Sequence, residues 1–396
     1  MTGRQILLDR AVRPANVPAM IDDTGLTRAI SDARLPGAAC LIVDRDTVRY
    51  SRSFGFAYAL AEAPMKPDTI CQIASMTKAL VSVAAMQLVE QGQIELDAPI
   101  GNVLPELADP QVLAGFAADG APILRPSVRP ITLRHLLTHT SGLGYAFVQP
   151  EILRYYQAVG IPAPGSKAGI SMPLLFDPGE DWAYGVSTDW VGLAIEAAVG
   201  TDLQSYLETH VFAPLGLKNT AFRGALPEGA AKVHMRGPEG GFALNPLYLG
   251  EGEFHSGGGG LTSTAEDYAR FLQMMLRGGE LDGNRLLKAE AIAEMSRNQV
   301  GEIRAGHMTT AMPEFAAPFD TFPDQHTGWG LGFLINPEPV PGGRSAGSLC
   351  WAGIFNSYYW IDPAAGVAGV FMSQLAPFGD PGALAAFGEL EKLAYK

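Results

Sequence analysis

Strand-like segments lie at both ends of this 396-residue chain, and a long stretch without them separates the two groups. Residues 38–44 and 48–57 are rich in β-branched and aromatic residues and flank a polar turn, which predicts an antiparallel hairpin. Comparable runs return only at 331–335, 358–361 and 367–372. Because strands must pair within a compact domain, we expect one antiparallel sheet assembled from both termini.

Helical periodicity fills much of the remaining sequence. We expect helices over residues 17–34, 74–91, 263–276 and 381–395, where apolar residues recur three or four positions apart. Either Ser263 or its neighbour Thr264 can cap the third of these. The predicted fold class is therefore α/β (α+β), with helices flanking the sheet.

The domain organisation follows from this distribution. Residues 1–79 and 251–396 are expected to form an α/β domain around the central antiparallel sheet. Residues 80–250 are expected to form a mainly helical domain inserted between them. Two Pro/Gly-rich stretches at 104–130 and 145–180 are predicted to be irregular, and irregular stretches of that length often form walls or lids of sites.

Composition excludes several classes of partner. Hydrophobic residues make up 47% of the chain and charged residues 17%, as in a globular protein, and the net charge of −13 disfavours nucleic acid and anionic membranes. Cys40, Cys71 and Cys350 are too far apart to predict a disulfide framework or a zinc site. We find no secretory signal and no apolar run of about 18 residues. The expectation is a cytoplasmic monomer or small homo-oligomer.

The segment Ser75-Met76-Thr77-Lys78 is the only Ser-x-x-Lys in the chain, and it opens a strongly apolar helix. The spacing places Ser75 and Lys78 on one helical face, where the lysine can act as the base that a serine nucleophile needs. The helix N-terminus offers amide N–H groups to a developing oxyanion. Taken alone, the same spacing also describes a capping serine with a surface lysine.

Several further motifs occur in an order that resembles a known superfamily. The chain resembles the class C β-lactamases and penicillin-binding proteins, and in particular the family VIII carboxylesterases among them. The resemblance extends from about Leu35 to Met372, and it rests on Ser75–Lys78, Ile131–Leu143, Pro178-Gly179 with Tyr184–Ser187, Gly258–Ala265 and Trp351–Gly353. It implies a β-lactamase-like fold, an active site at the junction of the two domains and no cofactor.

The resemblance assigns a third catalytic residue, Tyr184. In the superfamily a Tyr-x-Asn segment brings a phenol to the serine and lysine, where it takes a proton in acylation and passes it to the leaving group. A packed core tyrosine is the alternative interpretation. Val186 stands where the superfamily has asparagine, and valine cannot hold the side-chain amide of a β-lactam.

The strand beside the site also differs from the superfamily sequence, and this difference too disfavours β-lactams as substrates. It reads Trp351-Ala352-Gly353 where lactamases have Lys-Thr-Gly, so it replaces a cation with an apolar wall and favours neutral esters. By analogy the amides of Ser75 and Ile354 would form the oxyanion hole. Further pocket walls are predicted at three aromatic positions, Tyr145, Phe147 and Phe254.

Two other patterns have plainer interpretations. His135 and His139 are four residues apart, as metal-binding histidines on a helix can be, but the glutamate of a zinc-protease motif is missing and we predict no metal site. The four glycines at 257–260 are not followed by the Lys-Ser/Thr of a phosphate-binding loop. They are better explained by a tight turn and a close backbone approach.

The sequence therefore predicts a serine carboxylesterase that hydrolyses small neutral, short-acyl esters through an acyl-enzyme. An acyltransferase of the same fold stays open as an alternative, because the stretch from His135 to Pro150 resembles fungal polyketide acyltransferases of the superfamily. A weak β-lactamase or D-Ala peptidase is a second alternative. A penicillin-recognising protein that is acylated without turnover is a third.

Overall fold

The computed structural model of the chain describes residues 21–237 and 241–396. Residues 17–20 of the first predicted helix, and most of the segment searched for a secretory signal, lie outside the described residues. The helix that the structure shows there is α1 (Thr24–Asp32).

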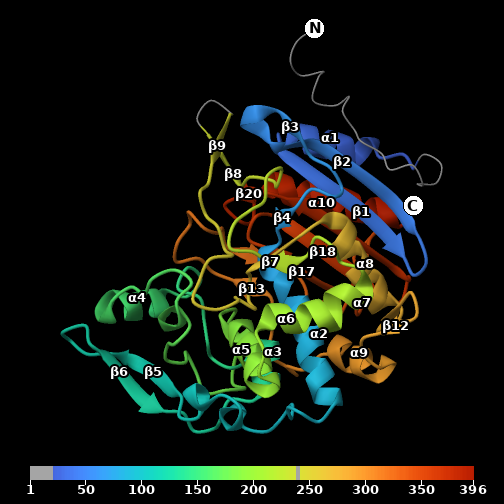
Figure 1. Cartoon of the computed structure of the whole chain (residues 1–396). Coiled ribbons are helices and arrows are strands. Elements are labelled where there is room, and N and C mark those ends of the chain that lie inside the picture. Colours follow the sequence, from blue (N-terminus) through green and yellow to red (C-terminus); the bar gives the residue numbers. More distant parts are fainter. Residues whose placement is uncertain (1–20, 238–240) are drawn as a thin grey trace.

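An eight-stranded antiparallel sheet joins the two ends of the chain. Figure 1 shows the blue N-terminal strands beside the red C-terminal ones, and Ala38 of the first strand pairs with Ser373 of the last long one. The two-terminus sheet and the N-terminal hairpin are thus confirmed. In spatial order the strands are β15 (Gly328–Trp329), β16 (Leu334–Ile335), β17 (Leu349–Gly353), β18 (Ser357–Asp362), β19 (Val367–Ser373), β1 (Gly37–Asp44), β2 (Val48–Tyr58) and β3 (Ala63–Pro64).

Helices cover both faces of this sheet. The helix α8 (Ala265–Leu276) brings Tyr268 to 5.3 Å from the ring of Tyr359, whereas α10 (Pro381–Ala394) brings Phe387 to 5.7 Å from the ring of Trp360. Tyr359 and Trp360 are adjacent residues of β18, and adjacent side chains of a strand point to opposite faces of the sheet. The two helices therefore lie on opposite faces of the sheet. Thr264 caps α8 by accepting a hydrogen bond from the amide of Asp267, which decides between the two predicted caps.

The middle of the chain supplies the remaining helices, which lie below the sheet in Figure 1. Among them α2 is buried continuously from Thr77 to Leu88, as its apolar sequence requires. No helix among the described residues is both long and apolar enough to cross a membrane. These helices are α2 (Thr77–Glu90), α3 (Leu133–Thr138), α4 (Pro150–Val159), α5 (Ser187–Val199), α6 (Leu203–Leu207), α7 (Ala213–Leu215) and α9 (Ala289–Ser296).

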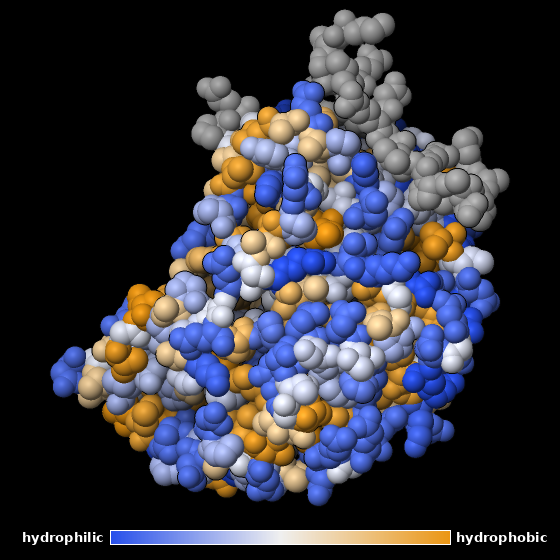
Figure 2. Space-filling model, viewed as in Figure 1, coloured by the Kyte–Doolittle hydropathy of each residue, from blue (hydrophilic) through white to orange (hydrophobic). Residues whose placement is uncertain are grey.

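The prediction that residues 145–180 are irregular was wrong at α4, Pro150–Val159. The prediction that residues 104–130 are irregular was also wrong. The segment contains the hairpin of β5 (Gln111–Phe116) and β6 (Pro122–Pro126), whose pairing shifts register between Leu113 and Gly115. That irregularity and the prolines hid the strand pattern. Figure 2 shows apolar residues gathered at the lower left, where Figure 1 places this hairpin; Ile123 of β6 is 48% exposed.

Short strands bring distant segments together around one point of the fold. The strand that precedes Ser75 pairs with the strand that follows the four glycines, Gln72 being opposite Thr262. The remaining strands are β4 (Cys71–Gln72), β10 (Leu261–Ser263) and β7 (Ala221–Phe222) in one sheet, β20 (Leu375–Ala376), β8 (His234–Arg236) and β9 (Phe242–Leu244) in another, and the pairs β11 (Glu280–Leu281) with β12 (Asn284–Arg285) and β13 (His307–Met308) with β14 (Phe319–Asp320).

Candidate active site

Ser75 lies in a short 3-10 turn, Ala74–Met76, between β4 and α2. It is the one residue between 71 and 80 that is not buried. Ala74 before it has a φ of 47°, a left-handed conformation that costs a non-glycine residue about 1 kcal/mol. The strained turn thus holds Ser75 partly exposed at the beginning of a buried helix.

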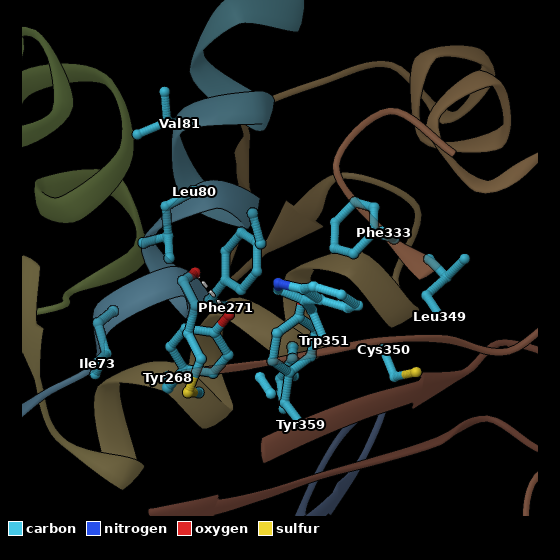
Figure 3. Packing of buried hydrophobic residues seen from close by; sticks show 14 of the residues in the cluster. Ile73, Leu80, Val81, Tyr268, Phe271, Phe333, Leu349, Cys350, Trp351 and Tyr359 are labelled. Atoms are coloured by element: carbon cyan, nitrogen blue, oxygen red, sulfur yellow. Dashed lines mark hydrogen bonds between the residues drawn. The ribbon is translucent and has the colours of Figure 1, made fainter. Parts of the chain in front are cut away.

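The turn is held by the elements packed around it. Figure 3 shows Tyr268 of α8 beneath the turn, and its hydroxyl donates a 3.0 Å hydrogen bond to the Met76 carbonyl oxygen. From the other side β17 approaches closely: a Cβ added to Gly353 would lie 2.4 Å from the carbonyl oxygen of Ile73. Gly353 therefore has no room for a side chain.

Lys78 is 1% exposed and lies next to Ser75. Its Nζ is 3.3 Å from Ser75 Oγ, 3.1 Å from the Tyr145 hydroxyl and 2.6 Å from the Gly258 carbonyl oxygen. An ammonium group has three hydrogens, so these three acceptors satisfy it completely. The predicted Ser75–Lys78 pair is therefore formed in the fold, in a site that excludes most water.

Gly258, whose carbonyl accepts from Lys78, is held through its amide by a buried carboxylate that the sequence analysis did not predict. Asp189 of α5 accepts hydrogen bonds from the Gly258 amide at 3.0 Å and from Ser256 Oγ at 2.6 Å. Burial raises the pKa of Asp189, while the charge of Lys78 lowers it. A Cβ on Gly258 would lie 2.4 Å from Asp189 Oδ2. The close approach predicted for the four glycines is present, and it gives Lys78 an acceptor.

Tyr184 is buried in an aromatic cluster beside Lys78. Its hydroxyl accepts a 3.0 Å hydrogen bond from the indole nitrogen of Trp351. Its ring centre lies 4.9 Å from the rings of both His139 and Trp351, and 4.8 Å from Lys78 Nζ. Trp351 was predicted as an apolar wall only. It also supplies a donor that stabilises negative charge on the phenol oxygen.

Tyr145 is a second phenol at the same lysine. Its ring stacks on Phe147 with centres 5.0 Å apart and meets the Tyr184 ring edge-on at 5.4 Å. Burial raises the pKa of Tyr145 well above its ordinary value, and the nearby Asp189 carboxylate adds to the effect. Tyr145 thus lines the cavity and is also a hydrogen-bond partner of Lys78.

A cavity of about 400 Å³ opens above these groups. The side chains of Asp189 and Glu251 are the charged ones among the described residues that line it. Lys78 is buried and is not among the lining residues. The cavity brings together the predicted residues Ser75, Tyr145, Phe147, Tyr184, Val186, Phe254, Trp351, Ala352, Gly353 and Ile354.

Part of the lining was not predicted, because it comes from segments without a motif. Residues 247–249, Met308, Ala316 and Phe378 also face the cavity. Met308 belongs to the two-residue strand β13, and the others lie between short strands or beyond the sheet, where no sequence pattern marks them. Only the fold brings them to the cavity.

Two backbone amides at the cavity have the environment of an oxyanion hole. The N–H groups of Ser75 and Ile354 donate to no acceptor within the described residues. Both residues line the cavity, one at the turn before α2 and the other just after β17. Free amides beside a nucleophile are what a tetrahedral oxyanion requires.

His135 and His139 do not share a helical face, because α3 ends at Thr138 and His139 takes a left-handed φ of 58°. The His135 ring accepts a hydrogen bond from the Thr132 amide, and burial lowers its pKa to about 4. His139 instead packs 5.3 Å from the Trp329 ring. Within residues 21–237 and 241–396 no group of three or more metal-binding side chains is assembled.

Acidification should destabilise the protein through His139. Burial, helped by the charge of Lys78, holds the pKa of His139 well below its ordinary value. In the unfolded chain a histidine takes up a proton near pH 6.5, so below that pH the unfolded state binds more protons and the free energy of unfolding falls. The expected loss is up to about 1.4 kcal/mol per pH unit for this residue.

Urea unfolding at pH 7.5, 6.5 and 5.5 measures this loss. His139→Gln should show a shallower decline with pH than the wild type, whatever its absolute stability. His326, which is exposed and whose Nε2 donates to the Glu302 carbonyl oxygen at 2.9 Å, provides the control variant His326→Gln, which should decline as the wild type does. Equal slopes for His139→Gln and the wild type would contradict the assignment.

The chain also contains Gly343-Arg344-Ser345-Ala346-Gly347, a Gly-x-Ser-x-Gly sequence. The motif marks a nucleophile when its serine sits on a strand-to-helix turn. Here it lies in the loop between β16 and β17, and Ser345 uses its amide to bind Asp362 Oδ2 at 2.7 Å. Ser345 is not among the residues that line the cavity above Ser75. The geometry of this motif therefore gives Ser345 no place at the cavity.

Comparison with known proteins gives a consistent result over nearly the whole chain. The family model described as Beta-lactamase matches residues 11–393. The monacolin J acid methylbutanoyltransferase of Aspergillus terreus is 32% identical over 388 residues, which cover 92% of each chain. The lovastatin esterase of Penicillium rubens is 31% identical over 366 residues, covering 88% of this chain and 91% of the relative.

Solved structures agree with this comparison. A mutant of simvastatin synthase from Aspergillus terreus has a TM-score of 0.80 and 31% sequence identity, covering 94% of this chain and 93% of that chain. The similar proteins thus include enzymes named as transferases and enzymes named as esterases.

Proposed function

Because this chain belongs to the Beta-lactamase family, we propose that it cleaves small neutral carboxylic esters through an acyl-enzyme on Ser75. Its relatives include one named as a methylbutanoyltransferase and one named as an esterase, and an acyl-enzyme can end in either transfer or hydrolysis. The observation that supports the proposal best is the 3.3 Å contact between Ser75 Oγ and Lys78 Nζ at the floor of the cavity.

Acylation uses the groups that surround Ser75. The phenolate of Tyr184 takes the hydroxyl proton as Ser75 Oγ, hydrogen-bonded to the Lys78 ammonium, attacks the ester carbonyl carbon. The resulting oxyanion binds the Ser75 and Ile354 amides. Tyr184 then gives a proton to the alcohol oxygen as the carbon–oxygen bond breaks, and the acyl group stays on Ser75.

Deacylation repeats these steps with a second nucleophile. Water, or an alcohol in its place, gives one proton to the Tyr184 oxygen while its own oxygen attacks the acyl carbon. The bond to Ser75 Oγ then breaks, and Tyr184 returns that proton to Ser75 Oγ. The hydrogen bond from Trp351 to the Tyr184 hydroxyl favours the phenolate during both transfers.

The cavity favours uncharged substrates with small acyl groups. Asp189 and Glu251 are acids, and Lys78 already has three acceptors, so a substrate carboxylate would meet no free cation among the lining residues that the structure describes. Burying an unpaired carboxylate is costly. Aromatic walls such as Tyr145 and Phe147 narrow the space beside Ser75, which favours short acyl chains.

Transfer of the acyl group to an alcohol is a second candidate function. The cavity of about 400 Å³ is larger than an acetyl or butyryl ester needs beside its nucleophile, and its walls are mainly apolar. Among the relatives is a methylbutanoyltransferase. A bulky apolar alcohol could occupy that space and compete with water.

Activity on p-nitrophenyl esters of graded chain length tests the proposal. We expect turnover of the acetate and butyrate, with kcat/KM at least about 10²-fold above that for nitrocefin, because Val186 and Trp351 each remove a polar contact worth about 1–3 kcal/mol to a lactam. Nitrocefin turnover equal to ester turnover would favour a β-lactamase instead.

A bulky apolar alcohol added to the butyrate reaction separates hydrolysis from transfer. Chromatography of the products gives the ratio of new ester to free butyric acid, and a ratio that rises with alcohol concentration supports the second candidate. Intact mass spectrometry checks the intermediate, since the acyl adduct should appear and decay with product formation. A permanent adduct without product would contradict both candidates.

A further inference from the structure

We propose that Gln72 is a positioning residue that sets acyl-chain selectivity by fixing one wall of the cavity. The wall consists of residues 247–249, Leu-Tyr-Leu, all of which line the cavity. The inference rests on the proposed function, because it concerns which acyl groups the Ser75 site accepts.

The Gln72 side chain bridges both ends of this wall. Its Nε2 donates to the Leu247 carbonyl oxygen at 3.2 Å, and its Oε1 accepts from the Leu249 amide at 2.9 Å. Gln72 is 2% exposed, so these bonds are made away from water. The wall belongs to no strand, so the side-chain amide of Gln72 makes the hydrogen bonds that a neighbouring strand would otherwise make.

The wall has little other support. Residues 245–260 contain no helix or strand, and the additional bonds are a 2.9 Å contact from the Leu247 amide to Asn245 Oδ1 and a 2.5 Å contact from the Tyr248 hydroxyl to the Arg223 carbonyl oxygen. Without Gln72 the amide of Leu249 would be left without its partner. A segment held by so few bonds samples more conformations.

The same strand that carries Gln72 leads into the nucleophile. Gln72 is the last residue of β4, three positions before Ser75. Its own backbone is held separately, because the Gln374 side chain accepts from the Gln72 amide at 3.1 Å and donates to its carbonyl oxygen at 2.9 Å. Changing the Gln72 side chain therefore leaves the position of β4 and Ser75 intact.

The position of the wall assigns it to the acyl group. Leu247 and Leu249 pack with Ile354 against the cluster that contains Ala74 and Phe355, so they lie on the oxyanion-hole side of Ser75. The leaving alcohol must reach the Tyr184 hydroxyl, whose ring neighbours are His139, Tyr145, Trp182 and Trp351. The acyl chain extends away from the leaving alcohol and hence towards the wall.

Gln72→Met tests the inference, since methionine has similar length and neither hydrogen bond. We expect the ratio of kcat/KM for p-nitrophenyl octanoate to that for the acetate to rise by at least about fivefold, while the acetate value changes by less than about twofold. Without the two hydrogen bonds from Gln72 the wall can move aside for the octanoyl chain. The acetyl group is too short to contact the wall. Leu249→Ala, which shortens the wall directly, should raise the same ratio and serves if Gln72→Met folds poorly.

Gln87→Met is the matched control, because Gln87 is also buried and its Nε2 donates to the His210 and Leu286 carbonyl oxygens, outside the site. Gln87→Met should lower the melting temperature as Gln72→Met does, but it should leave the octanoate-to-acetate ratio of kcat/KM unchanged. A ratio that stays constant or falls in Gln72→Met, or a uniform loss on all esters, overturns the inference. A wild type without ester turnover or acyl adduct would instead contradict the proposed function itself.

Discussion

Replacing Ser75 by alanine should reduce kcat on p-nitrophenyl acetate by roughly 10⁴–10⁶-fold, as the loss of a serine nucleophile does in other acyl-transferring enzymes. Alanine fits the 3-10 turn and keeps the Ser75 amide, so the cavity and the oxyanion donors should persist. The attacking oxygen and the acyl adduct disappear. Steady-state kinetics and intact mass after mixing with substrate measure the two losses.

Ser82→Ala is the matched control for this variant. Ser82 lies on the same helix, α2, is 1% exposed and has no hydrogen-bond partner for its hydroxyl within the described residues. Its removal should leave turnover within about twofold of the wild type. If Ser75→Ala kept even a tenth of the activity, another residue would be the nucleophile, and a labelled peptide from the acylated enzyme would identify it.

The sheet was predictable because its long strands have clear patterns and because both groups of strands need partners. The hairpin of β1 and β2, and the strands β18 and β19, fall close to their expected bounds. Two-residue strands such as β4 and β20 carry no pattern of their own. They form because tertiary packing brings their backbones together, which local propensity cannot indicate.

In the site, too, residues that belong to a sequence motif could be predicted, whereas contacts made through the backbone could not. Ser75 and Lys78 were predictable, because helical spacing fixes the distance between them. The Gly258 carbonyl and the carboxylate of Asp189 were not, since one is backbone and the other follows no motif. Trp351 was predicted as a wall of the site from its position. Its hydrogen bond to Tyr184 depends on the orientation of the indole ring, which no sequence motif indicates.

Comparing Tyr184→Phe with Tyr145→Phe should identify which phenol moves the proton. We expect Tyr184→Phe to lower kcat/KM on p-nitrophenyl butyrate by about 10²–10⁴-fold, the usual contribution of a positioned acid–base group. Tyr145→Phe should cost less than about tenfold, because the ring still stacks on Phe147 and Lys78 keeps two of its three acceptors.

The physical reason for the difference lies in what each hydroxyl contacts. Tyr184 receives a hydrogen bond from Trp351, which stabilises its ionised form. Burial and the Asp189 carboxylate hold the pKa of Tyr145 well above its ordinary range, so Tyr145 stays protonated while its oxygen accepts from Lys78. Trp351→Phe keeps an aromatic wall and removes only the donor, so its loss should lie between those of the two tyrosine variants.

The opposite ranking would reassign the proton transfer. Lys78 Nζ hydrogen-bonds to the Tyr145 hydroxyl at 3.1 Å but lies over the face of the Tyr184 ring, so geometry at the lysine alone would favour Tyr145. A loss above about 10²-fold in Tyr145→Phe, with Tyr184→Phe and Trp351→Phe nearly active, would make Tyr145 the acid–base group. Tyr184 and Trp351 would then serve only to pack the wall of the cavity.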